Sequence, residues 1–388
     1  MNFKNLKLFL LIISTFILST LSSPIISKRT NINEIKNLVN TKLFINNNLN
    51  NNNKANIEDF IDDLKDVFQN GMVNYIKLEQ IFSDLFNITI VDPIENLIDS
   101  TNHKTFSVKK DGFYGELFEP ENNRFPGKAL ILCTGSDGDF NMVRSLSKGL
   151  SNNGITVLGL GYFKVKGTPN VLTRIPLEYV EKAAKYLKSE GFEKIGMWGF
   201  SAGSVYALLS GVYFSDLLSL IVASSPGNYV FQGLGTLSFT QKKSAFSYKG
   251  KDIPYEPIGK IDVLKLIYLM IRDLEPNFLH VYEPGVTGAS ENHFIPVEKM
   301  KARLLIFSGE MDHCWPSDKA SKAIMKRLKE KNYSYPYEHI SCPYGGHVMT
   351  PFPTAMDIIT KASRDYPEEE KKYRKQHLEK LLEAFEEW

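Results

Sequence analysis

One serine of this chain stands in a motif that can turn it into a nucleophile. Gly199, Ser201 and Gly203 form a G-x-S-x-G sequence, with a β-type apolar run at 195–198 before it and a helix-type run of small residues from Ser204 after it. In that context the motif lifts a serine oxygen above a sheet edge on a strained backbone. The two glycines avoid Cβ atoms that would collide with the neighbouring strand and helix. We therefore predict that Ser201 is a nucleophile; the alternative is a plain Gly-Ser turn.

A serine hydroxyl is a weak nucleophile and needs a general base, which in turn needs an acid to orient it. In sheets that carry this motif, the acid follows the serine along the chain and lies in the loop after a late strand. Asp312 fits this position because it lies clear of an apolar run, in a loop closed by Trp315 and Pro316. Glu310 is the alternative acid.

The base should be a histidine that follows the acid, and the chain has seven histidines. His347 alone comes after a late strand-type run through a Gly345-Gly346 turn, which places an imidazole in a loop at the carboxyl edge of a sheet. We therefore predict that His347 is the base. The other six are interpreted as structural: His103, His280, His293, His313, His339 and His377.

Acyl chemistry also needs hydrogen-bond donors for the oxyanion that forms when a hydroxyl attacks a carbonyl. One should be the backbone N–H of Ala202, at the start of a helix whose dipole favours negative charge. The other should come from the loop after an early strand, where Ser136 in the 135–138 turn is the best placed, within one residue either way. This mechanism requires neither a metal nor a bound cofactor.

Residues 106–388 supply the elements that must position these side chains. Strand-type and helix-type runs alternate, which predicts an α/β fold: a mostly parallel, doubly wound sheet with helices on both faces. Two alternating runs at the start predict an antiparallel pair that leads into the sheet. The expected strands cover 106–108, 114–118, 128–134, 155–160, 195–198, 218–224, 302–308 and 337–341, and the expected helices cover 141–152, 176–190 and 317–331, with one more from Ser204 and a charged one at the C-terminus.

This alternation is interrupted between about residues 227 and 300, a stretch rich in glycine, proline and aromatic residues. Long insertions in such sheets usually lie over the binding crevice. We therefore expect much of this insertion to form a lid or a wall of the substrate pocket; a peripheral excursion is the alternative.

The first 105 residues differ in character from the rest. Residues 1–22 combine lysines, a short apolar run and small residues, which predicts a signal peptide and a secreted or secretory-lumen protein; an uncleaved anchor is the alternative. The run is too short for a comfortable membrane span, so none is expected after cleavage. The Asn-rich stretch 23–55 predicts a disordered linker. Apolar residues at helical spacing in 56–105 predict a small helical segment, either a cap or prosegment or a structural addition.

Composition limits the kinds of partner that the protein is expected to bind and the state of its cysteines. Lys and Arg number 46 against 44 Asp and Glu, and this formal net charge of +2 gives no case for nucleic-acid binding. Of the three cysteines, Cys133 lies in an apolar run and is expected to be buried. Cys314 and Cys342 flank the two loops that hold the expected acid and base, and are either free or bonded to each other. The oligomeric state is not indicated.

Four motifs together resemble one family. They are residues 158–163 (Leu-Gly-Leu-Gly-Tyr-Phe), 199–203, 308–317 (Ser-Gly-Glu-Met-Asp-His-Cys-Trp-Pro-Ser) and 344–347 (Tyr-Gly-Gly-His), and the likeness runs from about residue 106 to 354. The family is that of the acyl-CoA thioester hydrolases and bile-acid-CoA:amino acid N-acyltransferases, through their C-terminal catalytic domain. The resemblance implies an α/β-hydrolase fold and a triad of Ser201, Asp312 and His347 acting on an acyl thioester.

Three features depart from that family. The acyltransferase branch is often built on cysteine, and serine at position 201 favours hydrolysis because water readily releases an oxygen-ester acyl-enzyme. Ala202 stands where many members carry a basic residue, and the Asn-rich tract and helices stand in place of an immunoglobulin-like domain. We expect a serine hydrolase of small-molecule acyl thioesters or carboxylic esters. The alternatives are a non-catalytic binding module on this fold and a serine peptidase.

Overall fold

The computed structural model describes residues 104–388, apart from gaps at 235–241, 260–264, 266–268, 270–271, 274, 355 and 358–359. The expected signal peptide (1–22), the Asn-rich linker (23–55) and nearly all of the helical segment (56–105) lie outside the described residues. Every residue predicted to take part in catalysis lies within them: Ser136, Ser201, Ala202, Asp312 and His347.

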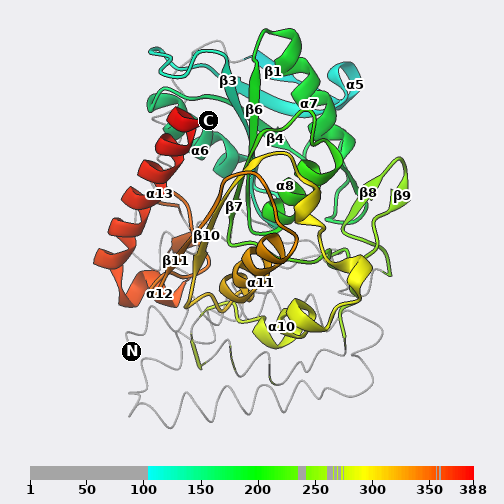
Figure 1. Cartoon of the computed structure of the whole chain (residues 1–388), viewed down its shortest axis with the longest axis vertical. Coiled ribbons are helices and arrows are strands. Elements are labelled where there is room, and N and C mark those ends of the chain that lie inside the picture. The colour runs from blue at the N-terminus through cyan, green and yellow to red at the C-terminus, as the bar shows by residue number, and fades with distance from the viewer. Residues whose placement is uncertain are drawn as a thin grey trace, which may run out of the picture. The chain divides into compact units, whose positions relative to one another are not determined.

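A mostly parallel sheet runs through the described part of the chain (Figure 1). Its eight strands there lie in the order β1-β2-β4-β3-β6-β7-β10-β11. The β1–β2 and β2–β4 pairs are antiparallel and the other neighbours are parallel. The strands are β1 Lys104–Phe106, β2 Tyr114–Phe118, β3 Lys128–Cys133, β4 Thr156–Gly161, β6 Lys194–Phe200, β7 Leu220–Ser224, β10 Arg303–Gly309 and β11 Tyr337–Cys342. This order confirms the mostly parallel sheet expected from the sequence.

Helices cover both faces of the sheet, and each face has its own apolar core (Figure 1). α7 (Glu178–Ser189), α8 (Ala202–Tyr213) and α11 (Ser317–Glu330) pack on one face, and α6 (Phe140–Asn152) and α13 (Pro367–Glu387) pack on the other. Successive side chains of a strand point to opposite faces. In β3, Ile131 therefore joins the first core while Leu130 and Leu132 join the second. The fold is a doubly wound α/β-hydrolase fold.

The chain enters this sheet two residues earlier than the sequence predicts. β1 is 104–106 rather than 106–108, and Val108 instead begins a short helix, α5 (Val108–Asp111). Ser107 caps that helix: its Oγ accepts from the Lys110 N–H at 3.3 Å, and its own N–H donates to the Asp111 carboxylate at 2.8 Å. Such local side-chain bonds compete with strand pairing, which explains why the strand stops before Ser107.

The insertion contributes two strands of a small second sheet and several short helices. Within the described residues this sheet has three strands: β5 (Ile175–Pro176), which precedes α7, and β8 (Phe246–Tyr248) and β9 (Lys251–Asp252) of the insertion. The helices are α10 (Leu279–Gly288), η2 (Glu291–His293) and η3 (Val297–Lys299), and a further one, α12 (Lys361–Asp365), precedes α13. The insertion leaves the main sheet at the carboxyl end of β7, the edge at which open α/β sheets bind their ligands.

The three cysteines lie among the described residues and are free thiols. Cys133 is buried, as expected, and Cys342 is buried as well, whereas Cys314 is partly exposed. Of the two states left open for Cys314 and Cys342, the structure therefore shows the unbonded one. None of the helices in the described part of the chain is long and apolar enough to cross a membrane.

Candidate active site

Ser201 occupies the sharp turn between β6 and α8. Its backbone has φ 54° and ψ −123°, a strained conformation for a residue with a side chain. A Cβ on Gly199 would lie 1.9 Å from the carbonyl oxygen of Gly203, and a Cβ on Gly203 would lie 2.3 Å from that of Thr134. No side chain fits at either position, so both glycines of the motif are required for the turn to close. This is the geometry of a nucleophile elbow.

The structure brings the three residues expected to act together into one chain of hydrogen bonds. The Nε2 atom of His347 lies 2.9 Å from the Ser201 hydroxyl, and its Nδ1 atom lies 2.9 Å from the Asp312 carboxylate. Ser201, Asp312 and His347 are buried, at 8%, 4% and 6% exposure. They come from the carboxyl ends of β6, β10 and β11, three parallel strands that end at the same edge of the sheet.

The carboxylate of Asp312 is held by four hydrogen bonds. Its Oδ1 accepts from the backbone N–H groups of Cys314 and Trp315, at 2.9 and 3.1 Å. Its Oδ2 accepts from the Ser317 hydroxyl at 2.6 Å and faces the His347 ring. The loop that carries the acid therefore folds around its own side chain and aims one oxygen at the imidazole. Glu310, the alternative acid, instead accepts from Ser341 at 3.1 Å.

The loop that carries His347 is fixed from two sides. The Ser225 hydroxyl donates to the His347 carbonyl oxygen at 2.6 Å, and the Phe200 and Trp315 rings lie 5.3 and 6.4 Å from the imidazole. Burial alone would lower the pKa of His347, but the charge and hydrogen bond of Asp312, together with the nearby Cys314, outweigh it and raise that pKa well above its ordinary value. The carboxylate therefore stabilises the protonated imidazole.

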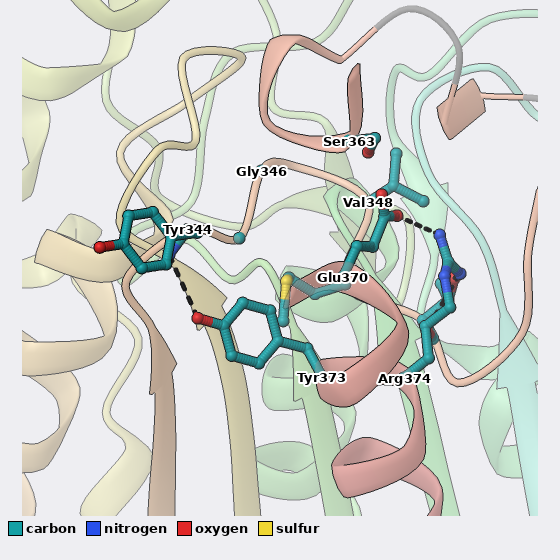
Figure 2. Close-up of a pocket in the computed structure, with 10 residues that line it drawn as sticks. Tyr344, Gly346, Val348, Ser363, Glu370, Tyr373 and Arg374 are labelled. Atoms are coloured by element: carbon teal, nitrogen blue, oxygen red, sulfur yellow. Dashed lines mark hydrogen bonds and ion pairs between the residues drawn. The ribbon is translucent and has the colours of Figure 1, made fainter. Parts of the chain in front are cut away.

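A water-sized cavity of about 10 Å³ lies behind this histidine loop (Figure 2). Tyr373 and Arg374 reach it from α13, and the Tyr344 N–H donates to the Tyr373 hydroxyl at 3.3 Å. Arg374 also donates to the carbonyl oxygens of Thr350 and Phe352, beyond His347. α13 thus anchors the histidine loop from the opposite side, and the cavity is too small for a substrate.

A larger cavity, of about 400 Å³, lies within the insertion. Aromatic, aliphatic and glycine residues dominate its lining, among them Tyr229, Phe231 and Tyr282. The Phe231 and Tyr282 rings each meet the Trp315 ring edge-on at 5.6 Å, and Trp315 in turn meets His347. A continuous row of aromatic rings therefore links the cavity wall to the imidazole.

The two expected oxyanion donors lie on either side of the elbow. Ala202 is the first residue of α8 and is buried. Gly135 and Ser136 open the turn after β3, and a Cβ on Gly135 would lie 3.2 Å from the Ser201 Cβ and 3.5 Å from its Oγ. The peptide that joins Gly135 to Ser136 is thus next to the candidate nucleophile.

Five of the six histidines interpreted as structural lie among the described residues, away from the Ser201 hydroxyl. His313 pairs with buried Glu275, His339 with Ser308 at 2.8 Å, and His293 with Glu256 at 2.8 Å. His377 stacks on the Phe307 ring, with centroids 3.5 Å apart. His280 lies on α10. His103 falls outside the described residues.

One neighbour of the imidazole was not expected from the sequence. Cys314 is considered in the sequence only as a possible disulfide partner, yet its side chain lies close enough to His347 to raise the pKa of that imidazole. The position of Cys314, two residues after Asp312, could have indicated that it lies near the imidazole, because the loop folds around that carboxylate.

Comparison with known proteins agrees with these observations. Residues 175–365 match the family described as "BAAT / Acyl-CoA thioester hydrolase C terminal", and this segment contains Ser201, Asp312 and His347. The family resemblance is confirmed.

Individual relatives show the same likeness at low identity. "Acyl-coenzyme A thioesterase 2, mitochondrial" of Mus musculus is 26% identical over 236 residues, 60% of this chain and 47% of that protein. "Acyl-coenzyme A amino acid N-acyltransferase 2" of Rattus norvegicus is 25% identical over 255 residues, 64% of this chain and 55% of that protein. A "Carboxylesterase" of Bacillus subtilis (strain 168) is 27% identical over 198 residues, 47% of this chain and 80% of that protein. The chain thus spans about half the length of the two mammalian relatives.

Proposed function

We propose that this chain is a serine hydrolase that cleaves acyl thioesters or carboxylic esters through an acyl-enzyme. The observation that carries the proposal is the hydrogen-bonded chain from Ser201 through His347 to Asp312, built on a strained elbow. A serine held at φ 54° has a strained backbone, which costs free energy, and a plain Gly-Ser turn does not require that strain. Strain of this kind is typical of active sites.

The first half of the reaction forms the acyl-enzyme. The Ser201 oxygen attacks the acyl carbon while Nε2 of His347 takes the hydroxyl proton, and Asp312 stabilises the imidazolium. The carbonyl oxygen becomes an oxyanion, held by the backbone N–H groups of Ala202 and Ser136. When the carbon–sulfur or carbon–oxygen bond to the leaving group breaks, His347 returns the proton to the departing thiolate or alkoxide.

The second half of the reaction regenerates the free serine. His347 takes a proton from water, the resulting hydroxide attacks the acyl carbon, and a second oxyanion forms at the same donors. The bond between the acyl carbon and Ser201 then breaks, the proton returns to the serine oxygen, and a carboxylic acid leaves. Every proton moves through one imidazole, so the arrangement needs no further acid or base.

The substrate class rests on the comparisons and on the nucleophile. The relatives include proteins named as acyl-coenzyme A thioesterases, an acyl-coenzyme A amino acid N-acyltransferase and a carboxylesterase. Serine rather than cysteine at position 201 favours release of the acyl group to water. We therefore favour hydrolysis over transfer of the acyl group to an amine.

Labelling with a fluorophosphonate probe tests the mechanism directly. We expect the probe to bond covalently to the wild-type protein and not to Ser201→Ala. Ser308→Ala is the matched control, because Ser308 also faces a histidine, His339 at 2.8 Å, but lies within β10 rather than on an elbow. Labelling should survive in that variant.

A panel of acyl-CoA thioesters and p-nitrophenyl esters then separates the two substrate classes. Absence of labelling and of hydrolysis in folded wild-type protein would refute the hydrolase and favour a binding module on this fold. If the probe labels the protein and the protein cleaves peptides but neither thioesters nor p-nitrophenyl esters, a peptidase is favoured.

We also propose that the chain enters the secretory pathway. The basic and apolar start of the sequence supports this. Expression of the full chain in a eukaryotic host should give secreted protein whose N-terminus lies near residue 23. Protein that stays inside the cell and still begins at Met1 would contradict the proposal.

A further inference from the structure

Tyr162 immediately follows β4, the strand that lies next to β3 in the sheet. Its side chain is 3% exposed. Its hydroxyl lies 2.8 Å from the carbonyl oxygen of Thr134 and 2.9 Å from that of Gly135. One hydroxyl proton is therefore shared between two carbonyl groups at the start of the loop expected to provide an oxyanion donor. The mechanism described above does not use this side chain.

The carbonyl of Gly135 belongs to the same peptide unit as the N–H of Ser136. A trans peptide is planar, and its C=O and N–H point in opposite directions. A bond that holds the Gly135 oxygen toward Tyr162 therefore turns the Ser136 N–H away from Tyr162. That peptide unit is beside the nucleophile, because a Cβ on Gly135 would lie 3.2 Å from the Ser201 Cβ.

We propose that the Tyr162 hydroxyl fixes the orientation of the Gly135–Ser136 peptide and so keeps one donor of the oxyanion hole in place. Tyr162 is a positioning residue, since it acts through the peptide and not on the substrate. The inference rests on the proposed hydrolase function for its catalytic consequence, while the orientation of the peptide is a property of the resting protein.

The peptide needs such a contact because few other contacts among the described residues hold it in place. Glycine allows a wide range of backbone angles, so the unit after Gly135 can turn over at small cost. The Gly138 N–H also bonds to the Gly135 oxygen, but at 3.3 Å, which is long for a backbone hydrogen bond. The Tyr162 hydroxyl makes the shorter contact with this oxygen.

The tyrosine itself is held firmly. Its ring stacks on that of Tyr206, with centroids 5.0 Å apart and an interplanar angle of 18°, and meets the Phe163 ring edge-on at 5.0 Å. Burial raises the pKa of the Tyr162 hydroxyl well above its ordinary value, so the group stays protonated and remains a donor. Hydrogen bonding to a carbonyl also polarises the amide and strengthens its N–H as a donor.

Tyr162→Phe tests this proposal because it removes the hydroxyl and keeps the stacked ring. With a p-nitrophenyl ester we expect kcat to fall roughly 10- to 100-fold, less than the 100- to 1000-fold typical of losing a donor outright. KM should stay within about twofold, because the donor acts on the transition state and not on bound substrate.

Tyr206→Phe is the matched control. Tyr206 is also fully buried, and its hydroxyl also donates to a carbonyl oxygen, that of Pro176 at 2.5 Å, away from the oxyanion loop. Both variants lose one buried hydroxyl of the same type, so their loss of stability should be similar. Only Tyr162→Phe should lose turnover.

An NMR measurement can report on the environment of the Gly135–Ser136 peptide without any measurement of catalysis. Labelling glycine with ¹³C at the carbonyl and serine with ¹⁵N leaves two doubly labelled peptides, Gly135–Ser136 and Gly203–Ser204, and Ser136→Ala removes the first signal. We expect Tyr162→Phe to move the Gly135–Ser136 signal and Tyr206→Phe to leave it in place.

The outcomes separate this inference from the proposed function. A fall in turnover together with a displaced Gly135–Ser136 signal supports both. An unmoved signal, with Tyr162→Phe as active as Tyr206→Phe, overturns the inference and leaves the hydrolase standing. A displaced signal in a protein that hydrolyses no ester or thioester supports the peptide's orientation by Tyr162 and refutes the hydrolase.

Discussion

At the scale of single residues, the candidate site is organised around one imidazole with two different bonds. In the proposed mechanism His347 accepts a proton from Ser201, while the Asp312 carboxylate favours the protonated ring and raises the pKa of His347. These two demands are opposed. The raised pKa makes the imidazole a stronger base once neutral, but it also means that the base becomes free only at higher pH.

The pH profile of the wild-type protein and of Asp312→Asn should report this balance. Because the neutral imidazole is the active form, kcat/KM should rise with pH, with a midpoint above the ordinary imidazole value of about 6.5. Asp312→Asn removes the charge that raises the pKa, so the midpoint should move to lower pH while kcat falls by roughly three to four orders of magnitude. Glu310→Gln is the control, because that carboxylate bonds to Ser341 and should leave the midpoint unmoved. A midpoint unchanged in Asp312→Asn would contradict the assigned pairing.

A second prediction at this scale concerns the thiol beside the base. Cys314 lies beside His347 and is partly exposed, whereas burial raises the pKa of Cys342 to about 12 and that of Cys133 higher still. Iodoacetamide should therefore modify Cys314 alone in the folded protein. The added group should crowd the imidazole and abolish ester hydrolysis.

The Cys314→Ala variant makes the test specific. It should keep most of its activity and resist iodoacetamide, and intact mass should show one modification in the wild type and none in the variant. Equal inactivation of both proteins would show that the thiol does not lie where the structure places it.

At the scale of elements, the sequence predicted the features that depend on contiguous residues or on the order of strands. It did not predict contacts between loops that are distant in the sequence. Ser201 was visible because its glycines and flanking runs are contiguous, and the order of the late strands indicated Asp312 and His347. The contacts of Tyr162 and Cys314 were not visible, because each joins loops from separate strands that only the folded sheet brings together. The early end of β1 was missed for a local reason, the capping bonds of Ser107.

The packing of α13 on the sheet leads to a prediction about acid stability. His377 is 1% exposed, stacks on Phe307 at 3.5 Å and meets Trp198 edge-on at 5.5 Å. Neither of its ring nitrogens has a hydrogen-bond partner in the described part of the chain. Burial, with a smaller effect from Arg374, lowers the pKa of His377 well below its ordinary value. The folded protein therefore holds this imidazole neutral.

The sign of the effect follows from the two states. Below the ordinary histidine pKa of about 6.5 the unfolded chain binds a proton at His377 that the folded chain does not, so the free energy of unfolding falls as pH decreases. The slope from this residue approaches about 1.4 kcal/mol per pH unit. Urea unfolding of His377→Phe should show a smaller loss between pH 7 and pH 5 than the wild type. Identical losses in the two proteins would contradict this account.

At the scale of the whole molecule, aromatic rings join the insertion to the candidate site at the carboxyl edge of the sheet. Residues 227–300 leave β7 at the carboxyl edge and return to β10, and between those points they enclose the cavity of about 400 Å³. Trp315 joins its wall to His347 through Phe231 and Tyr282. The lining is mainly aromatic, aliphatic and glycine, with Glu256 and His280 also present, and such a cavity is suited to the acyl chain of a substrate. We expect it to set the chain length that the protein accepts.

Gly288 allows this expectation to be tested without disturbing the fold. It lines the cavity at the last position of α10, and a Cβ added there meets nothing within 4 Å. Gly288→Leu should fill part of the cavity, so hydrolysis of a long-chain p-nitrophenyl ester should fall roughly 10-fold or more, the scale on which apolar pockets discriminate by size. A short-chain ester needs only the site near Ser201, and its kcat/KM should hardly change. Gly288→Ala, which adds a single methyl group, should lie between the wild type and Gly288→Leu. Equal losses for both esters would place the acyl chain outside this cavity and return the insertion to a peripheral role.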